Sequence, residues 1–342
     1  LMASTIPTVD LSPFLTDEGV IVGAEPTSAQ AEAAAQINDA CRRHGFVHVV
    51  NFGLSPATEA SAFAAAAALF AQPEQHKLDT LARITPKTNT GYSPFAFECL
   101  NRARPPDLKE AFNVRDPDVH GNDFAGCPDG FEEAALALWA ELAQAARRYA
   151  VACALALGLE RDYFVRSLSR MDLCTLRFLH YPPCDMPSES AVDGGGAAIR
   201  VGEHTDFGAY TFLLLGEGAR GLQIKPVDGG EVGGSAGGEA GGWIDAALPA
   251  RPAGTVGAVV NTGALMARWT NDTWRATAHR VVVPTAEVAA AHRYSIACFI
   301  DPDAEAAVAV DERFVSPGEA PRYGPTTGLE FLLMKLREAQ GA

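Results

Sequence analysis

The sequence predicts a mixed α/β protein whose second half forms a β-barrel or a double-sheet jelly roll. Two observations predict this class. Alanine-rich segments with apolar residues at helical spacing dominate the first 170 residues, and short β-rich runs separated by turn residues follow Met171. The chain has 342 residues, of which 48% are hydrophobic and 20% charged, as in ordinary globular proteins. We expect one compact unit, with a mainly helical region over residues 1–170 and a β-rich core over residues 171–342.

Helical spacing predicts three long helices in the first half, over residues 28–43, 55–71 and 131–157. The first ends in the basic pair Arg42-Arg43 before Gly45, which is a typical C-terminal stop. The β-branched run at residues 46–50 predicts a strand between the first two helices. A short helix is expected over residues 162–169.

Turn residues divide the second half into short strands and a closing helix. The strands are expected at residues 175–181, 209–215, 222–224, 256–260, 277–283 and 294–300. Glycine-rich inserts at residues 194–198 and 228–242 interrupt them and are expected to be surface loops. The apolar pattern at residues 329–337 predicts a final helix that packs back on the core, because it is too short to be stable alone.

The net negative charge of the chain limits the classes of partner that it is expected to bind. There are 27 basic and 42 acidic side chains, a formal net charge of −15, and no run rich in Lys or Arg. Nucleic acids and anionic membranes are bound through such runs, so we expect neither partner. We expect a small-molecule partner, and the oligomeric state stays open.

The cysteines and the N-terminal residues indicate the cellular compartment to expect. The seven cysteines are scattered without a Cys-x-x-Cys pair, which argues against a disulfide or zinc framework. The first residues contain neither a basic segment followed by an apolar leader nor an Arg-rich transit pattern, and no apolar run reaches the length of a membrane helix. We therefore expect a reducing, cytoplasmic location.

Metal chemistry is indicated by His204 and Asp206 together with His279, 73 residues after Asp206. A His-x-Asp triplet alone is a short motif that also occurs by chance in polar turns. A second histidine on a later strand of the same barrel would complete a face of two histidines and one carboxylate. That face leaves three positions open on an octahedral metal, which suits non-haem Fe(II), whereas zinc would be satisfied by four tetrahedral ligands.

A carboxylate site is indicated by Arg293 and Ser295, which lie in a predicted strand and project to the same face because side chains alternate. A guanidinium beside a hydroxyl is suited to binding a carboxylate. The alternative is that Arg293 pairs with a local Asp or Glu side chain.

These residues lie within a series of motifs that resembles the isopenicillin N synthase-like branch of the Fe(II)/2-oxoglutarate-dependent oxygenases. The similarity spans nearly the whole chain, through residues 6–11 (IPTVDL), 44–46 (HGF), 107–113 (DLKEAFN), 176–183 (LRFLHYPP), 202–208 (GEHTDFG), 260–263 (VNTG), 268–272 (RWTND) and 293–295 (RYS). The resemblance implies a double-stranded β-helix (jelly-roll, cupin-like) core with flanking N-terminal helices and a C-terminal helix.

The resemblance also implies roles for individual residues. His204, Asp206 and His279 would bind Fe(II), Arg293 and Ser295 would hold the distal carboxylate of 2-oxoglutarate, and Tyr181 would assist in binding this cosubstrate. The cofactors implied are therefore Fe(II), 2-oxoglutarate and O2.

Four aromatic residues are candidates for the substrate pocket. Phe207 follows a proposed metal ligand, and Phe299 lies on the same strand face as Ser295. Tyr92 and Phe95 occupy a region that often lines the substrate mouth in the resembling family, although aromatic residues between Pro and Gly also serve as loop anchors. His180 is expected to face away from Tyr181 and to have a structural role.

The expected activity is oxidation, most simply hydroxylation, of a C–H bond of a small organic molecule, with release of succinate and CO2. Desaturation, cyclisation and demethylation are open, as is the identity of the substrate. Two alternatives are an O2-dependent non-haem iron oxidase of the same fold that does not use 2-oxoglutarate, and a non-catalytic small-molecule binding protein.

Overall fold

The computed structural model describes residues 6–15, 25–85, 87–99, 101, 105–184, 198–225, 242–249 and 254–340. The glycine-rich inserts expected at 194–198 and 228–242 lie outside the described residues, except for Ala198 and Gly242. In the part that is described, no helix is both long enough and apolar enough to cross a membrane.

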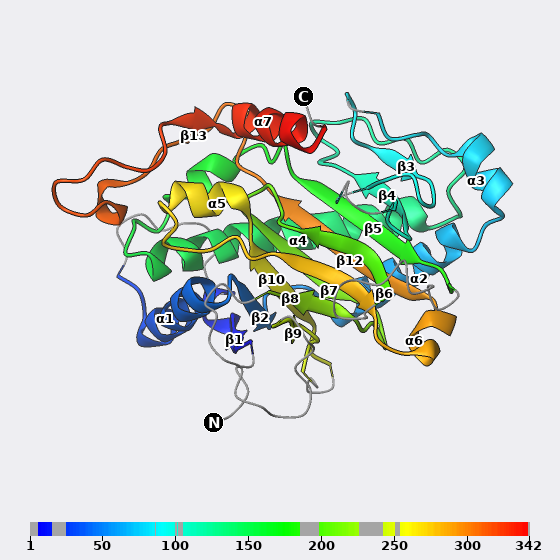
Figure 1. Cartoon of the computed structure of the whole chain (residues 1–342), viewed down its shortest axis with the longest axis horizontal. Coiled ribbons are helices and arrows are strands. Elements are labelled where there is room, and N and C mark those ends of the chain that lie inside the picture. The colour runs from blue at the N-terminus through cyan, green and yellow to red at the C-terminus, as the bar shows by residue number, and fades with distance from the viewer. Residues whose placement is uncertain are drawn as a thin grey trace.

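Two β-sheets form the centre of the molecule (Figure 1). The larger sheet has the strand order β1-β2-β10-β7-β12-β5-β4-β3, and the smaller one has the order β6-β11-β8-β9. Their bounds are β1 Thr8–Asp10, β2 Phe46–Val50, β3 Gly91–Ser93, β4 Glu110–Val114, β5 Thr175–Tyr181, β6 Ala198–His204, β7 Tyr210–Leu215, β8 Leu222–Ile224, β9 Ile244–Asp245, β10 Gly257–Thr262, β11 His279–Val283 and β12 Arg293–Ile300. A small third sheet joins β13 Ala307–Val308 to β14 Thr326–Thr327. The architecture is a jelly-roll core with flanking helices.

Helices flank the two sheets. They are α1 Ser28–Arg43, α2 Pro56–Phe70, α3 Glu74–Thr80, α4 Phe131–Ala156, α5 Ala264–Trp269, α6 Ala286–Ala290 and α7 Gly328–Gln340, with short 3-10 turns at Ser12–Phe14, Val165–Leu168 and Glu312–Phe314. The long helix α4 runs behind the larger sheet in Figure 1, and Tyr149 on α4 packs on Tyr210 and Phe212 of β7. The first helix begins with a capping box, in which Thr27 and Gln30 each bind the other's backbone N–H.

Alternation along the central strands separates a packed face from a cavity face. On β5, Leu176 and Phe178 point into the main core under the helices. Leu179 and Tyr181 instead face the smaller sheet, where a second apolar cluster contains Val201 and other residues of β6, β8 and β11. Because side chains alternate, every second residue of β5, β7 and β12 is available to line the space between the two sheets.

Most expected elements are confirmed, including the helix at 28–43 and the strands at 46–50, 175–181 and 222–224. Three corrections are needed. Strand β6 begins at Ala198, inside a segment predicted to be a loop, because the neighbouring glycines obscure the alternation of Ile199 and Val201 with polar residues. Strands β3 and β4 lie between the second and third predicted helices, where no strand was predicted. The helix expected at 162–169 is a single 3-10 turn, Val165–Leu168.

The larger sheet takes strands from both halves of the chain. Strand β2 pairs with β10, and β4 pairs with β5, so the first 170 residues supply four of its eight strands. The division of the chain into two regions at residue 170 stays a prediction. Strands from both sides of this boundary are hydrogen-bonded to one another in the larger sheet.

Candidate active site

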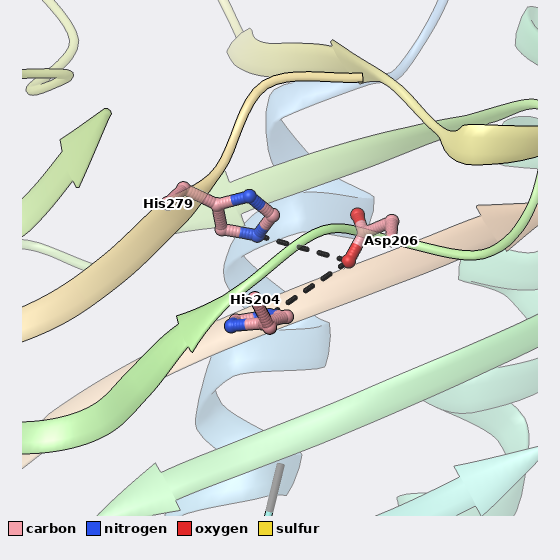
Figure 2. A group of neighbouring side chains, drawn as sticks. All are labelled: His204, Asp206 and His279. Atoms are coloured by element: carbon pink, nitrogen blue, oxygen red, sulfur yellow. Dashed lines mark ion pairs between the residues drawn. The ribbon is translucent and has the colours of Figure 1, made fainter. Parts of the chain in front are cut away.

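Three candidate metal ligands converge at one end of the smaller sheet (Figure 2). His204 is the last residue of β6 and His279 is the first residue of β11, and the two are direct partners in the antiparallel pairing. Asp206 lies on the chain just beyond β6. One ligand atom from each residue can be chosen so that all three atoms lie within 4.8 Å of one another. Asp206 Oδ1 is 3.9 Å from Nε2 of His204 and 3.7 Å from Nε2 of His279.

Hydrogen bonds fix which atoms of the three residues remain free. Asp206 Oδ2 accepts hydrogen bonds from Nδ2 of Asn261 (2.7 Å) and Oγ1 of Thr211 (2.6 Å), so Oδ1 is left to face the imidazoles. Nδ1 lies near the Gly202 carbonyl in His204 (2.8 Å) and near the Thr277 carbonyl in His279 (3.2 Å). A carbonyl only accepts, so Nδ1 carries a hydrogen in both residues, and in the neutral form of such an imidazole Nε2 has the lone pair.

The protonation states of His204 and Asp206 also favour metal binding. Burial and the nearby His279 lower the pKa of His204 to about 4, so its imidazole is neutral at physiological pH. Burial alone would raise the pKa of Asp206, but the two imidazoles and the hydrogen bonds from Asn261 and Thr211 outweigh it and hold this pKa below its usual range. Two imidazoles and one carboxylate, with open space beside them, are the donor set of a non-haem Fe(II) site, so the residues fit the metal.

The guanidinium of Arg293 is buried in the same cavity, with the residue 4% exposed. Its Nη1 donates to Ser295 Oγ (3.3 Å) and its Nε to the Arg220 carbonyl (3.2 Å), and it lies 4.7 Å from the ring centre of Tyr181. Among the described residues, no carboxylate forms an ion pair with it. The alternative of a local Asp or Glu partner therefore finds no support, and a buried cation of this kind needs an anionic ligand.

A cavity of about 380 Å³ between the two sheets contains both groups of residues. The candidate metal ligands, Arg293 and Ser295 all contribute to its wall. Its size suits a cosubstrate and a small organic molecule.

Two protein-family profiles match this chain. One, described as the non-haem dioxygenase in morphine synthesis N-terminal, matches residues 6–129, and the other, the 2OG-Fe(II) oxygenase superfamily, matches residues 172–302. The chain belongs to the 2OG-Fe(II) oxygenase superfamily. The profile for the superfamily includes the segments that carry all three candidate metal ligands and Arg293.

Relatives of the oxygenase agree with this assignment. The 2-oxoglutarate-dependent dioxygenase citB of Monascus ruber is 28% identical over 313 residues, which cover 86% of this chain and 84% of citB. A full-length Neurospora crassa protein, crystallised in complex with alpha-KG, is 28% identical, with a TM-score of 0.78 over 97% of this chain and 95% of that protein. Its complex with alpha-KG and thymine is 27% identical, with a TM-score of 0.74 over 97% and 96% of the two chains.

The resemblance stated from the motifs is thus confirmed, together with the jelly-roll fold and the enzyme class. The oxygenase is a non-haem iron, 2-oxoglutarate-dependent dioxygenase, and its family uses Fe(II), 2-oxoglutarate and O2.

The aromatic pocket candidates have different environments in the oxygenase. Phe207 and Phe299 line the cavity. Tyr92 and Phe95 are not among its lining residues, so their expected placement is corrected. Tyr92 is buried in the core, where its hydroxyl donates to Glu110, and Phe95 is 41% exposed on a loop.

Sequence reasoning missed several residues that line the cavity of the oxygenase. Asn261 lies in the quoted segment 260–263, but nothing in the sequence indicated that it binds Asp206. Thr175 and Arg177 could have been found, because alternation on β5 places them on the same face as Tyr181. Asp301, just after β12, also lines the cavity, and burial together with the nearby Asp206 raises its pKa to about 7.

Proposed function

We propose that the oxygenase binds Fe(II) through His204, Asp206 and His279 and hydroxylates a C–H bond of a small organic molecule. One observation carries the proposal: a partly buried triad with free Nε2 and Oδ1 atoms shares a cavity with a buried guanidinium that has no carboxylate partner among the described residues. Iron accounts for the first group, and the dicarboxylate cosubstrate accounts for the second.

We assign the distal carboxylate of 2-oxoglutarate to Arg293 and Ser295. Ser295 already accepts a hydrogen bond from Arg293, so its hydroxyl hydrogen is available to the same anion. The ring of Tyr181 holds the guanidinium from one side, and burial strengthens the attraction between Arg293 and an anion. When bound, Fe(II), 2-oxoglutarate and O2 supply the oxidant, and the cosubstrate leaves as succinate and CO2.

The remaining residues orient the reactants and exclude water. Asn261 and Thr211 hold one oxygen of Asp206, which keeps the other oxygen directed at the metal position. Phe207 and Phe299 give the substrate part of the cavity apolar walls. The similar Neurospora crassa protein was crystallised with thymine and with 5-formyluracil, which supports a small-molecule substrate here.

We further propose that the enzyme acts in the cytoplasm. All seven cysteines are free thiols, and two of the most buried, Cys41 and Cys298, have pKa values raised to about 12 by burial. Free thiols are typical of a reducing compartment.

An anaerobic titration tests the proposal. Protein loaded with Fe(II) is titrated with 2-oxoglutarate while the visible metal-to-ligand charge-transfer band is recorded. The wild type is expected to develop the band. Arg293→Leu is expected to keep iron but to need roughly 10- to 100-fold more cosubstrate, because a charge-assisted hydrogen-bonded pair is lost.

Arg170→Leu is the matched control, because Arg170 is an exposed arginine outside the cavity. It should titrate like the wild type. Iron binding without the band would contradict the use of 2-oxoglutarate, and a failure to bind iron would contradict the assignment of the triad.

A further inference from the structure

The cavity has a second polar region, far from the end assigned to the cosubstrate. In the pairing of β5 with β12, Tyr181 is opposite Arg293, Arg177 is opposite Ala297, and Thr175 is opposite Phe299. At about 3.4 Å per residue, Arg177 lies about 14 Å along the sheet from the Arg293 pair. Arg177, Thr175 and Phe299 therefore belong to the part of the cavity that the cosubstrate leaves to the substrate.

A chain of hydrogen bonds fixes the amide orientation of Asn113 in this region. Asn89 Nδ2 donates to Thr175 Oγ1 (3.2 Å), and Asn113 Nδ2 donates to the Asn89 side-chain oxygen (3.1 Å) and, more weakly, to its backbone carbonyl (3.4 Å). Because that carbonyl can only accept, the nitrogen of the Asn113 amide must face Asn89. Asn113 Oδ1 is thus the free end, and it is buried without a hydrogen-bond partner in the described part of the chain.

Arg177, the cross-strand partner of Asn113, has a donor without a partner among the described residues. Asn113 and Arg177 are direct partners in the β4–β5 pairing, and both line the cavity. Arg177 uses its Nη2 atom to bind Glu98, whereas its Nε is buried and has no partner among the described residues. Buried polar atoms without partners are unfavourable, so a ligand that offers one donor and one acceptor would relieve both.

The charges of this region cancel. Glu98 binds both Arg177 and Lys109, and Lys109 also lies 3.3 Å from Asp107, which gives two cations and two carboxylates. Among the described residues of the cavity wall, Arg293 is the one cation without a carboxylate, and it is assigned to the cosubstrate. Asp301 adds an acidic group and no cation. A substrate with a carboxylate would therefore find no uncompensated positive charge here.

We propose that Arg177 and Asn113 select a neutral, planar cyclic amide or imide as the substrate. In a ring amide the C=O acceptor and the N–H donor are adjacent, so the carbonyl can accept from Arg177 while the N–H donates to Asn113. Phe299 and Phe207 would pack against the ring. The inference rests on the proposed function, because it needs the cosubstrate at the Arg293 end.

Matched ligands test the proposal on the wild-type protein. Protein loaded anaerobically with Fe(II) and 2-oxoglutarate is titrated by calorimetry with thymine, with 1,3-dimethylthymine and with indole-3-acetate. Thymine is expected to bind at least roughly tenfold more tightly than the dimethyl compound, which lacks N–H donors, and than the carboxylic acid. Equal affinity for the two thymines, no binding of thymine, or tighter binding of indole-3-acetate would each overturn the proposal.

Two variants locate the effect. Arg177→Lys keeps a positive charge near Glu98 but removes Nε, and Asn113→Leu removes Oδ1. Each should weaken thymine binding about ten- to hundredfold and leave the charge-transfer band with 2-oxoglutarate unchanged. Arg170→Lys, on the surface, is the control.

The charge-transfer band distinguishes a failure of the substrate proposal from a failure of the proposed function. If the band forms normally but thymine binds all variants alike, the recognition by Arg177 and Asn113 is wrong and the proposed function stands. If wild-type protein forms no band, the proposed function itself fails.

Discussion

At the level of single residues, the two oxygens of Asp206 have different surroundings. Oδ2 is held by Asn261 and Thr211, and Oδ1 faces the two imidazoles. A carboxylate with about four lone-pair sites could otherwise rotate, and the hydrogen bonds reduce that freedom before a metal arrives. At the proposed site, metal affinity would therefore depend on residues that do not themselves bind the metal.

The double variant Asn261→Ala/Thr211→Val tests this dependence. We expect Fe(II) affinity to fall about 10- to 100-fold because Asp206 loses both donors, while the three ligands remain. Anaerobic iron titration followed by equilibrium dialysis measures the change. Thr58→Val, which removes a hydroxyl bound to Glu141 far from the cavity, should leave iron affinity unchanged. If the double variant binds iron like the wild type, the hydrogen bonds do not position Asp206.

The buried pair Lys77 and Glu110 joins two elements, α3 and β4. Lys77 Nζ lies 2.7 Å from Glu110 Oε2, with both side chains almost fully buried, and Tyr92 and His180 also bind Glu110. His180 stacks on Phe70 of α2 and does not line the cavity, in agreement with alternation on β5. The sequence predicts a structural role for His180 but does not reveal its partner on β4.

Lys77→Met leaves Glu110 buried without its cation. We expect the free energy of unfolding to fall by about 3 kcal/mol, because an uncompensated buried charge is more costly than the pair. Denaturant unfolding of the metal-free protein measures it. Lys335→Met removes an exposed ion pair with Glu338 and should change stability by about 1 kcal/mol or less. Similar losses in the free energy of unfolding for Lys77→Met and Lys335→Met would contradict a stabilising role for the buried Lys77–Glu110 pair.

The junction of β10 and α5 determines the position of the loop that carries Asp206. A Cβ on Gly263 would lie 2.2 Å from the Gly208 carbonyl oxygen, and the backbone N–H of Ala264 donates to the Asp206 carbonyl. The close approach of these two backbones leaves no room for a side chain at residue 263.

Gly263→Ala should therefore displace the loop. We expect a loss of about 2 kcal/mol in the free energy of unfolding, from overpacking, together with weaker Fe(II) binding. Gly324→Ala is the control, because a Cβ there would meet nothing within 4 Å. Unfolding curves and iron titrations of both variants check the prediction, and normal iron binding by Gly263→Ala would show that the loop tolerates the shift.

Across the whole molecule, buried carboxylates connect pH to stability. Burial alone would raise the pKa of Glu98 and of Glu110, but the Arg177 and Lys109 charges around Glu98, and the His180, Lys77 and Tyr92 contacts of Glu110, hold both below the usual range. A lowered pKa in the folded state means that the unfolded state binds protons first as the pH falls.

The stabilisation from these carboxylates is therefore present above about pH 4.3, the ordinary pKa of glutamate, and is lost as the pH falls through the lower folded-state values. We expect the melting temperature to decrease steeply below about pH 4. Calorimetric scans from neutral to acidic pH measure it, and Glu98→Gln should show a shallower decrease. Parallel curves for the variant and the wild type would exclude Glu98 as a source of the acid sensitivity.

Local signals in the chain were enough to predict most helices and strands, the family and the candidate residues for binding iron and cosubstrate. Helical spacing predicted α1 and α4, short β-rich runs predicted β5 and β12, and ordered motifs pointed to His204, Asp206, His279 and Arg293, because each signal lies within a short stretch of chain. Glycine-rich neighbours hid β6. The family resemblance placed Tyr92 and Phe95 at the substrate mouth, but a resemblance does not say which way a side chain faces, and neither residue is among those that line the cavity.

The meeting of distant residues depends on how the strands are ordered in space. The pairing of β4 with β5 brings Asn113 to Arg177, and the pairing of β10 with β7 places Asn261 opposite Thr211, from where both donate to Asp206. The absence of a carboxylate beside Arg293 in the described residues is likewise a property of packing, since the chain has 42 acidic side chains that could have paired with it. Such contacts follow from strand order and burial, which join segments far apart in the sequence and leave no local pattern in it.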